Sequence, residues 1–448
     1  MTVIPTSDTR SSMIQQLQSL LGATQVVAGD DLAQPLRDRL SWAIAPKSDL
    51  PCVVYPQTQD ELAEVVAYAA HHHWRLLPMG SGSKMHWGGL AEPVHLVVST
   101  ARLNQLVDHA IGDLTITAEA GMPFHSMAST LRQANQHLGL DPAYAEQATI
   151  GGIVATGDTG ALRQRYGGVR DRVIGLSFVR ADGTMAKAGG RVVKNVAGYD
   201  LMKLMVGAYG TLGIISQLTF RVYPDVETSQ TVVVTGEADA IQRLTAAVLA
   251  SSLTPHRFDV LSPKLIQILD FGETVGLAIQ FASMAVSVMQ QVQQLSEMAI
   301  AQSLSVTALL QHDAESALWR QLQNPIHFPN TQSSITCKIG VLPNKAVAAI
   351  QELSDELPAE AIAHIHASSG LGTVQFDGAA IAPTVVLRLR NWCETNGGFL
   401  SVLDAPQTWK QQIDVWGYSG NALPVMQRLK SQFDPHRILN PGRFVGGI

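Results

Sequence analysis

Three glycine-rich segments between residues 80 and 213 constrain the fold of this 448-residue chain more than any other feature. They are residues 80–84 (GSGSK), 149–157 (TIGGIVATG) and 207–215 (GAYGTLGII). The first segment follows a β-rich run. The third forms a glycine-containing turn that leads into another β-rich run. The adjacent glycines of the second lie inside an apolar run, where they destabilise both helix and strand. A ligand that approaches the backbone explains such glycines, and three segments of this kind indicate one extended ligand.

The first loop lacks the spacing of the two commonest nucleotide-binding loops. A G-x-G-x-x-G dinucleotide fingerprint needs glycine at position 85, which is Met85. A P-loop needs Gly-Lys-Ser/Thr, whereas Lys84 stands between Ser83 and Met85. The remaining interpretations are a loop whose amides hold an anion and a plain tight turn. From this loop alone the two are equally compatible.

The composition excludes several classes of protein. The chain has 31 Lys+Arg and 37 Asp+Glu, a formal net charge of −6, so we expect no nucleic-acid partner. Charged residues make up 15%, below the ~25% of an average domain, which indicates surface covered by a large ligand, buried helices or partner subunits. At roughly 150 residues per domain, the length suggests two or three domains.

The three cysteines, Cys52, Cys337 and Cys393, lie far apart and form no C-x-x-C pair. This excludes a cysteine-held iron–sulfur cluster or structural zinc within the chain and argues against a disulfide framework. The N-terminal residues lack the pattern of a secretory signal. The longest apolar stretch, residues 275–289, is shorter than the ~20 residues that a membrane span needs. We therefore expect a cytoplasmic, soluble protein.

Changes in sequence pattern divide the chain. Residues 52–84 read as strand, helix, strand, and short β-branched runs punctuated by glycine follow as far as Pro224, which favours an α+β sheet region. Amphipathic helices then alternate with strands, and the tail becomes rich in glycine and proline again. The predicted division is a helical lead-in (1–45), a ligand-binding domain (46–224), an α/β cap domain (225–428) and a C-terminal segment (429–448) that returns to the ligand-binding domain.

Five motifs, in this order, carry a resemblance to a known family. They read PMGSGSK (78–84), ATIGGIVATGDTG (148–160), RYGGVRDRVIG (165–175), VVKNVAGYDLMKLMVGAYGTLGIIS (192–216) and FDPHRILNPGRF (433–444). The set resembles the FAD-binding fold of the vanillyl-alcohol oxidase / p-cresol methylhydroxylase superfamily. Within it, the chain most closely resembles the E-type FAD-binding subunits of glycolate oxidase (glycolate dehydrogenase). KNVAGYDL followed by GxYGxLG is a specific combination, whereas a single glycine loop is weak evidence.

The resemblance implies an α+β, two-subdomain FAD-binding fold of the p-cresol methylhydroxylase type with an α/β cap domain. It also implies that three segments contact FAD: the first loop at the diphosphate, and the other two beside the flavin. The implied cofactor-binding residues are Gly80, Ser81, Gly82, Ser83, Thr149, Gly151, Gly152, Ala155, Thr156, Gly213 and Ile214. Relatives with covalent flavin carry a histidine where this chain has Ser83, so we expect non-covalent FAD. His86 lies three residues later and is better explained as a loop histidine.

No metal site is predicted. Relatives that oxidise 2-hydroxy acids hold a divalent metal with a histidine-rich segment and a later Glu-His pair. Here only His364 and His366 remain, and two histidines without a carboxylate make a poor site. Their i, i+2 spacing on a strand places both on one face, and a structural role is favoured.

The catalytic residues stay unknown from the sequence. Oxidation of a hydroxy acid needs a group that accepts the hydroxyl proton and a cation that holds the carboxylate. Candidates near the second glycine segment are Arg163, Arg165, Arg170, Arg172 and Tyr166, with surface pairing or a subunit contact equally compatible for the arginines. Two roles are equally compatible with the sequence, lining of the cofactor pocket and helix capping, for Lys194, Asn195, Tyr199 and Asp200.

These implications lead to one main hypothesis for function. The chain is expected to be an FAD-dependent oxidoreductase acting on CH–OH groups, as the FAD-binding subunit of a multi-subunit glycolate (2-hydroxy acid) dehydrogenase in glyoxylate metabolism. Its expected partners are the D-type catalytic flavin subunit and an iron–sulfur subunit, since this chain has no cluster ligands to carry electrons away. Attachment to the inner face of a membrane through that complex is an alternative to a purely cytoplasmic location. The alternatives for function are a self-sufficient FAD-dependent hydroxy-acid dehydrogenase and a non-catalytic scaffold that retains the fold.

Overall fold

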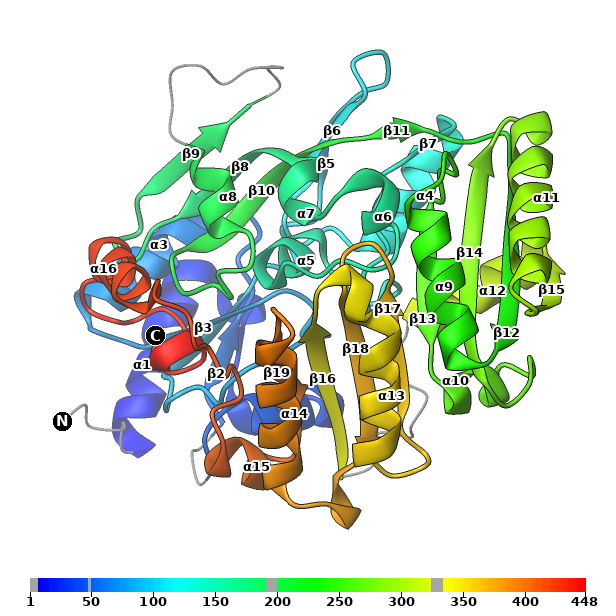
Figure 1. Ribbon diagram of the computed structural model, residues 1–448. Helices are drawn as coiled ribbons and strands as arrows, with labels where there is room; N and C mark the ends of the chain where they lie inside the picture. Colours follow the sequence, from blue (N-terminus) through cyan, green and yellow to red (C-terminus); the bar gives the residue numbers. More distant parts are fainter. Residues whose placement is uncertain (1–6, 47–49, 191–199, 324–332) are drawn as a thin grey trace. The chain divides into compact units, whose positions relative to one another are not determined.

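A computed structural model describes residues 7–46, 50–190, 200–323 and 333–448 (Figure 1). The chain divides into two compact units. The first unit comprises Met1–Thr159, Gly168–Pro224 and Tyr418–Ile448, and the second comprises Gly160–Gly167 and Asp225–Gly417. Residues 418–428, which the sequence-based division assigns to the cap, lie in the first unit.

The first unit begins with a small sheet in the order β1-β2-β4-β3. Its strands are β1 (Val26–Val27), β2 (Cys52–Val54), β3 (Leu76–Met79) and β4 (Leu96–Ser99), and both β2 and β3 run parallel to β4. Helix α3 (Gln59–His71) connects β2 to β3 and starts where Thr58 Oγ1 accepts a hydrogen bond from the Glu61 amide at 3.1 Å. Strand β3 therefore ends directly at the first glycine loop, as the sequence pattern predicts.

The second sheet of this unit is antiparallel, in the order β5-β6-β10-β8-β9. Its strands are β5 (Leu106–Ala110), β6 (Thr115–Glu119), β8 (Val173–Val179), β9 (Met185–Gly189) and β10 (Ile214–Arg221). A separate short pair consists of β7 (Gln136–His137) and β11 (Tyr223–Pro224). Strand β10 begins at the third glycine segment, so two of the three segments lie at strand ends.

Helices of the first unit close the apolar cores of these sheets. They are α1 (Ser7–Leu21), α2 (Gln34–Ala43), α4 (Phe124–Gln133), α5 (Ile150–Thr156), α7 (Val169–Arg172), α8 (Leu201–Met205) and α16 (Leu423–Phe433). The buried Lys430 of α16 donates to the Thr211 carbonyl at 2.9 Å and to the Leu439 carbonyl at 2.7 Å. The C-terminal segment is thereby joined to the third glycine segment.

The second unit is built on an eight-stranded antiparallel sheet in the order β15-β12-β14-β13-β17-β18-β16-β19. The strands are β12 (Thr228–Gly236), β13 (Arg257–Leu261), β14 (Val275–Ser283), β15 (Ser305–Leu310), β16 (Ser334–Gly340), β17 (Ile362–His366), β18 (Leu371–Asp377) and β19 (Phe399–Asp404). The helices are α6 (Arg163–Tyr166), α9 (Ala238–Leu249), α10 (Pro263–Ile268), α11 (Ala285–Ala301), α12 (His312–Gln323), α13 (Ala346–Glu356), α14 (Pro383–Thr395) and α15 (Gln407–Gln412).

The two faces of this sheet differ in polarity. Phe258 of β13 and its partner Ile279 of β14 belong to the apolar core that α9, α11, α13 and α14 complete. Because successive side chains in a strand point to opposite faces, Arg257, Asp259 and Gln280 lie on the other face. That other face carries acid–base and hydrogen-bonding groups beside a smaller apolar core, in which Leu265 of α10 and Trp319 of α12 are buried.

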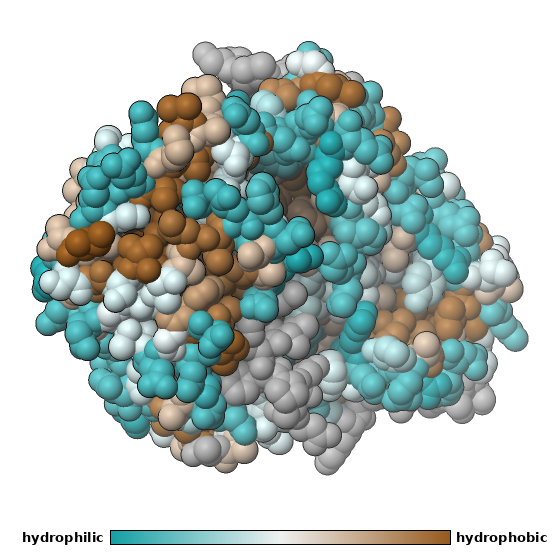
Figure 2. All heavy atoms as spheres, turned by 90° about the vertical axis from the view of Figure 1, so that its right-hand side faces the viewer, coloured by the Kyte–Doolittle hydropathy of each residue, from teal (hydrophilic) through white to brown (hydrophobic). Residues whose placement is uncertain are grey.

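Several apolar side chains remain exposed on the second unit. Met284 and Met289 at the start of α11 are 67% and 66% exposed, and Leu309 of β15 is 52% exposed. Figure 2, which shows the side of the molecule where these elements lie, has brown hydrophobic patches between hydrophilic residues. Among the described residues, no helix combines the length and apolar character that a membrane crossing requires.

Candidate functional site

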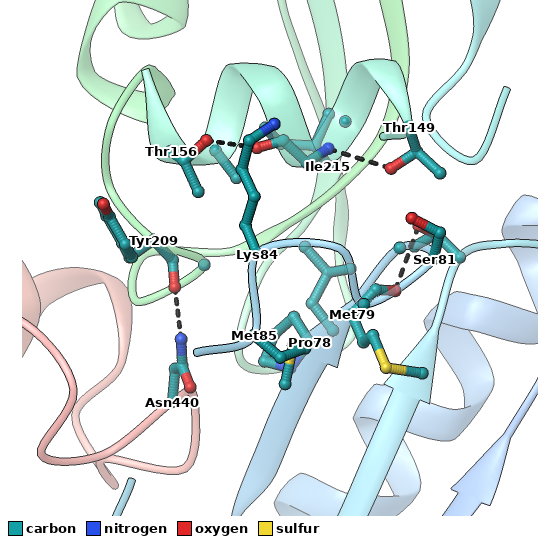
Figure 3. Close-up of a pocket in the computed structure, with 18 of the residues that line it drawn as sticks. Pro78, Met79, Ser81, Lys84, Met85, Thr149, Thr156, Tyr209, Ile215 and Asn440 are labelled. Atoms are coloured by element: carbon teal, nitrogen blue, oxygen red, sulfur yellow. Dashed lines mark hydrogen bonds between the residues drawn. The ribbon is translucent and has the colours of Figure 1, made fainter. Parts of the chain in front are cut away.

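A pocket in the first unit brings all three glycine-rich segments together (Figure 3). Its space, including the open mouth, amounts to about 750 Å³, which is in the range of small-molecule and cofactor sites. Its lining comes from residues 78–85, 149–156 and 209–215, together with Thr100, Asn440 and Arg443. Segments distant in the sequence therefore form one cradle, as the interpretation of one extended ligand requires.

The first loop continues from β3 and forms one wall. Arg39 of α2 holds this loop by donating from Nη1 to the Ser81 carbonyl at 3.0 Å. Gly82 has φ +81°, a conformation that L side chains rarely adopt. The Ser81 hydroxyl is buried and has no hydrogen-bond partner among the described residues. A buried donor without a partner is costly, so this loop offers a hydrogen bond to a bound ligand.

The second segment forms helix α5, although its adjacent glycines disfavour a helix. Thr149 caps α5 by accepting from the Gly152 amide at 3.2 Å, and this cap offsets the poor helix propensity of the two glycines. Glycine is needed at position 151 because a Cβ there would lie 2.7 Å from the Ala120 carbonyl oxygen. Close packing of α5 against the chain beside β6 therefore explains Gly151 without a ligand.

The third segment and the C-terminal segment form the remaining wall. The Asn440 amide nitrogen donates to the Tyr209 carbonyl, while its Oδ1 is buried without a partner among the described residues. Arg443 is 3% exposed and donates to the carbonyls of Met85, at 2.8 Å, and Trp87. Burial lowers the pKa of Arg443 to about 10, so it stays charged at neutral pH. Burial also raises the pKa of Tyr209, which remains a neutral phenol.

The charge of the pocket wall is positive. Lys84 and Arg443 are the two charged side chains among its 21 described lining residues, and neither Asp nor Glu is among them. A wall of this kind favours an anion, and the diphosphate of a dinucleotide carries two negative charges. The unpartnered Ser81 hydroxyl, the unpartnered Asn440 oxygen and the two cations together fit a polar, anionic ligand such as FAD.

All eleven residues that the family resemblance assigns to the cofactor line this pocket. Their individual contacts with FAD remain predictions. Ten further lining residues were not assigned from the sequence, and they include Lys84, Tyr209, Asn440 and Arg443. Lys84, Tyr209 and the NPGR tail all lie inside the motifs that carry the family resemblance, and this was the signal available for them.

The arginines predicted near the second segment do not line the pocket. Arg165 and Arg170 are exposed and Arg163 is half-buried. Arg172 is buried and its guanidinium lies 4.9 Å from the centre of the Tyr223 ring. This cation–π contact gives Arg172 a structural role within the first unit.

Other polar candidates also lie away from the pocket. Tyr166 stacks edge-on with His256 in the second unit, with their ring centres 5.7 Å apart. Asp200 is exposed and pairs with Lys203. Lys194, Asn195 and Tyr199 lie outside the described residues, so their roles remain predictions.

The histidine pair of the second unit has a carboxylate partner that the sequence pattern did not reveal. Asp259 of β13 pairs in register with His366 of β17, and its carboxylate lies 2.7 Å from His366 Nδ1 and 3.3 Å from His364 Nδ1. Burial alone would raise the pKa of Asp259, but the two histidines hold it well below its usual range. His364 Nε2 also lies 2.7 Å from the Thr373 hydroxyl.

The expectation that these histidines lack a carboxylate is therefore wrong. The ligand-type atoms of the three residues lie within 4.8 Å of one another, close enough for metal ligation. The hydrogen bonds to Asp259 equally support the structural role that the sequence favours. That role, and the absence of a bound metal, remain predictions.

Comparison with known proteins supports the assignment of the pocket. Residues 50–189 match the model of the FAD binding domain family. The fold is similar to that of 4-ethylphenol oxidase from Gulosibacter chungangensis, with a TM-score of 0.72 over 98% of this chain and 97% of that one, at 14% identity. At that identity the likeness concerns the fold alone.

Three curated relatives differ in how much of their length they share with the chain. Glycolate oxidase subunit GlcD of Bacillus subtilis is 31% identical over 50% of this chain and 48% of its own length. Subunit GlcE of Escherichia coli is 39% identical over 36% of this chain and 46% of its own length. D-2-hydroxyglutarate dehydrogenase of Xanthomonas citri pv. viticola is 25% identical over 87% of this chain and 88% of its own length. The chain thus spans about half of each glycolate oxidase subunit and most of the dehydrogenase.

The family match and the lining of the pocket identify an FAD-binding protein. Residues 50–189 are thereby identified as an FAD binding domain. The predicted fold class and cofactor are confirmed, and the predicted enzyme class agrees with the dehydrogenase relative. The substrate, the partners and the manner of flavin attachment remain predictions.

Proposed function

We propose that the protein is a self-sufficient FAD-dependent dehydrogenase of small 2-hydroxy acids. The observation that carries the proposal is the cationic cradle of the first unit, which joins the family-matched loops to the C-terminal Asn440 and Arg443. The alignment with D-2-hydroxyglutarate dehydrogenase over 88% of that enzyme's length favours this function over a subunit role. This function is the alternative expected from the sequence and not the main hypothesis.

The described residues suggest how the chain would hold its cofactor. The loop amides with the Ser81 hydroxyl would hold the diphosphate, and α5 with Gly213 and Ile214 would line the flavin. Bound FAD supplies the two-electron acceptor for oxidation of a CH–OH group. Asn440 and Arg443, which hydrogen-bond to the carbonyls of Tyr209 and Met85, would form the wall of the cofactor site on the C-terminal side.

The reaction also needs a proton acceptor and a cation for the substrate carboxylate. Groups of both types gather on the polar face of the second unit. His364, with its side chain 17% exposed, is oriented by Asp259, and Arg257 lies on the same face. Orientation by a carboxylate fixes the ring of a histidine that works as a base. The second unit therefore contains side chains of both chemical types, and we propose His364 and Arg257 as candidates for these roles.

A second candidate function is the subunit role in a glycolate dehydrogenase complex. The 39% identity with subunit GlcE of E. coli over 165 residues favours it, as do the exposed apolar side chains of Met284, Val286 and Met289. All three cysteines are buried and free, so electrons from the flavin would have to leave through another subunit or a diffusible acceptor. The proposed partners are then a D-type catalytic flavin subunit and an iron–sulfur subunit. A cytoplasmic location, with or without membrane attachment through that complex, belongs to this proposal.

Turnover by the purified chain separates the two candidates. We expect glycolate, D-lactate or D-2-hydroxyglutarate to reduce an artificial electron acceptor in the presence of this chain alone. A yellow protein that stays inactive with all three, and becomes active only when its partner subunits are added, would establish the subunit role instead.

Acid precipitation tests the manner of flavin attachment. Position 83 holds Ser83, whose hydroxyl cannot form the histidyl bond of covalent relatives, so the flavin should remain in the supernatant when the protein is precipitated. The supernatant absorbance, measured against the yellow colour of the pellet, gives the released fraction. A yellow pellet would show a covalent bond and would point to another attachment residue, such as His86.

A further inference from the structure

Lys84 is a buried cation on the wall of the FAD pocket. Its side chain is 5% exposed, and its ammonium lies 3.0 Å from the carboxylate of Asp158, which is 11% exposed. Figure 3 shows the side chain extending from the first loop toward the helix that carries Thr156. A buried lysine is expensive to desolvate, so its place in the pocket requires an explanation.

Asp158 has a second contact that fixes it independently of Lys84. Its Oδ2 accepts a hydrogen bond from the Ala143 amide at 2.9 Å. Asp158 itself does not line the pocket, whereas Lys84 does. The carboxylate therefore acts as a fixed anchor behind the ammonium.

Arg443, the other cation of the pocket, donates hydrogen bonds to backbone carbonyls. Arg443 Nη2 donates to the carbonyls of Met85 and Trp87, and it thereby holds the turn that follows Lys84. The Lys84 ammonium also lies 5.5 Å from the centre of the Trp87 ring, inside that turn. Arg443 thus positions the segment, and Lys84 is the cation with three donors that can rotate toward an anion.

We infer that Lys84 recognises the diphosphate of FAD and makes the pocket select the dinucleotide over riboflavin. The inference rests on the proposed role of the pocket as the FAD site. Lys84 directly follows residues 80–83, the loop expected at the diphosphate, and it lines the pocket, whereas its partner Asp158 does not. A diphosphate with two negative charges completes that arrangement as a charge-assisted contact.

A purely structural salt bridge predicts a different pattern of mutational effects. If the pair only braces the first loop against the end of α5, then Lys84→Met and Asp158→Asn should weaken every flavin equally. If Lys84 binds the diphosphate, Lys84→Met should weaken FAD alone. Asp158→Asn should then leave FAD binding unchanged or tighter, because it removes the negative charge that competes for the ammonium. The asparagine side chain keeps an oxygen for the Ala143 amide, so the substitution is matched in shape.

The experiment titrates flavin-free full-length protein with FAD and with riboflavin, at low and high salt. For Lys84→Met we expect the dissociation constant of FAD to rise roughly 10- to 100-fold, from the loss of one charge-assisted hydrogen bond. The riboflavin constant should stay unchanged, and the salt dependence of FAD binding should become shallower. Lys84→Arg keeps the charge and should restore most of the affinity, which also controls for a folding defect of the methionine variant.

Three outcomes would overturn the inference. These are an unchanged FAD constant in Lys84→Met, an equal loss of FAD and riboflavin binding, and a loss in Asp158→Asn as large as that in Lys84→Met. Each presupposes that the wild-type chain binds FAD. A wild-type chain that takes up neither flavin would instead refute the proposed function, so the two failures are distinguishable.

Discussion

Replacing Gly82 with tryptophan should reduce the FAD content of the purified protein by at least about tenfold. Gly82 is buried in the first loop at φ +81°, where any L side chain costs about 1–2 kcal/mol. A Cβ at this position already lies 3.2 Å from the Met79 sulfur, so an indole must displace the loop or enter the pocket. The flavin-to-protein absorbance ratio of the purified variant measures the effect.

Gly112→Trp is the matched control for this substitution. Gly112 lies in the exposed turn between β5 and β6, and nothing approaches its Cβ position within 4 Å. The control should keep the wild-type flavin content. Equal flavin content in the Gly82 and Gly112 variants would show that the first loop does not contact the cofactor.

Replacing Asp434 with alanine should lower the free energy of unfolding by about 3–5 kcal/mol, because it leaves a buried charge uncompensated. Asp434 and Lys430 are 0% and 4% exposed, and they form an ion pair of 2.7 Å. Asp434 also accepts from the amides of Ile438, at 3.0 Å, and Leu439, at 2.8 Å. Burial lowers the pKa of Lys430, an effect that Asp434 opposes. Urea unfolding followed by intrinsic fluorescence measures the loss.

Asp200→Ala tests whether burial of the ion pair causes the large loss of stability expected for Asp434→Ala. Asp200 pairs with Lys203 on α8, but the two side chains are 41% and 42% exposed. Its loss should cost no more than about 1 kcal/mol, as is usual for exposed pairs. If the two variants unfold at the same urea concentration, then the Lys430–Asp434 pair does not hold the C-terminal segment in the way described.

The sequence predicts local structure well where period and capping agree. Thr58 caps α3 as its position before an amphipathic run indicates, and β3 ends at Gly80. The exception is α5, because two glycines argue against a helix by propensity. Gly151 is required in this helix because it packs closely against Ala120. The two residues are 31 positions apart (151 − 120), so no local sequence pattern contains this contact.

The sequence predicted those parts of the candidate site that lie within recognisable motifs, and it did not predict contacts between distant segments. The glycine loops identified the pocket wall through backbone requirements, which are local. The Asp259–His366 contact depends on the register of two strands separated by 107 positions, and no local pattern sets that register. The role of Arg443 likewise depends on carbonyls far away in the chain, with sequence separations of 358 and 356.

The most direct test of the proposed function is the reductive half-reaction of the purified chain. A 2-hydroxy acid is added anaerobically to the FAD-loaded protein in the absence of partner subunits, and the visible absorption bands of the flavin are followed. We predict that they bleach with glycolate, D-lactate or D-2-hydroxyglutarate, and that an acceptor restores them. Flavin bands that persist with all three acids, while dithionite bleaches them, would contradict a self-sufficient hydroxy-acid dehydrogenase.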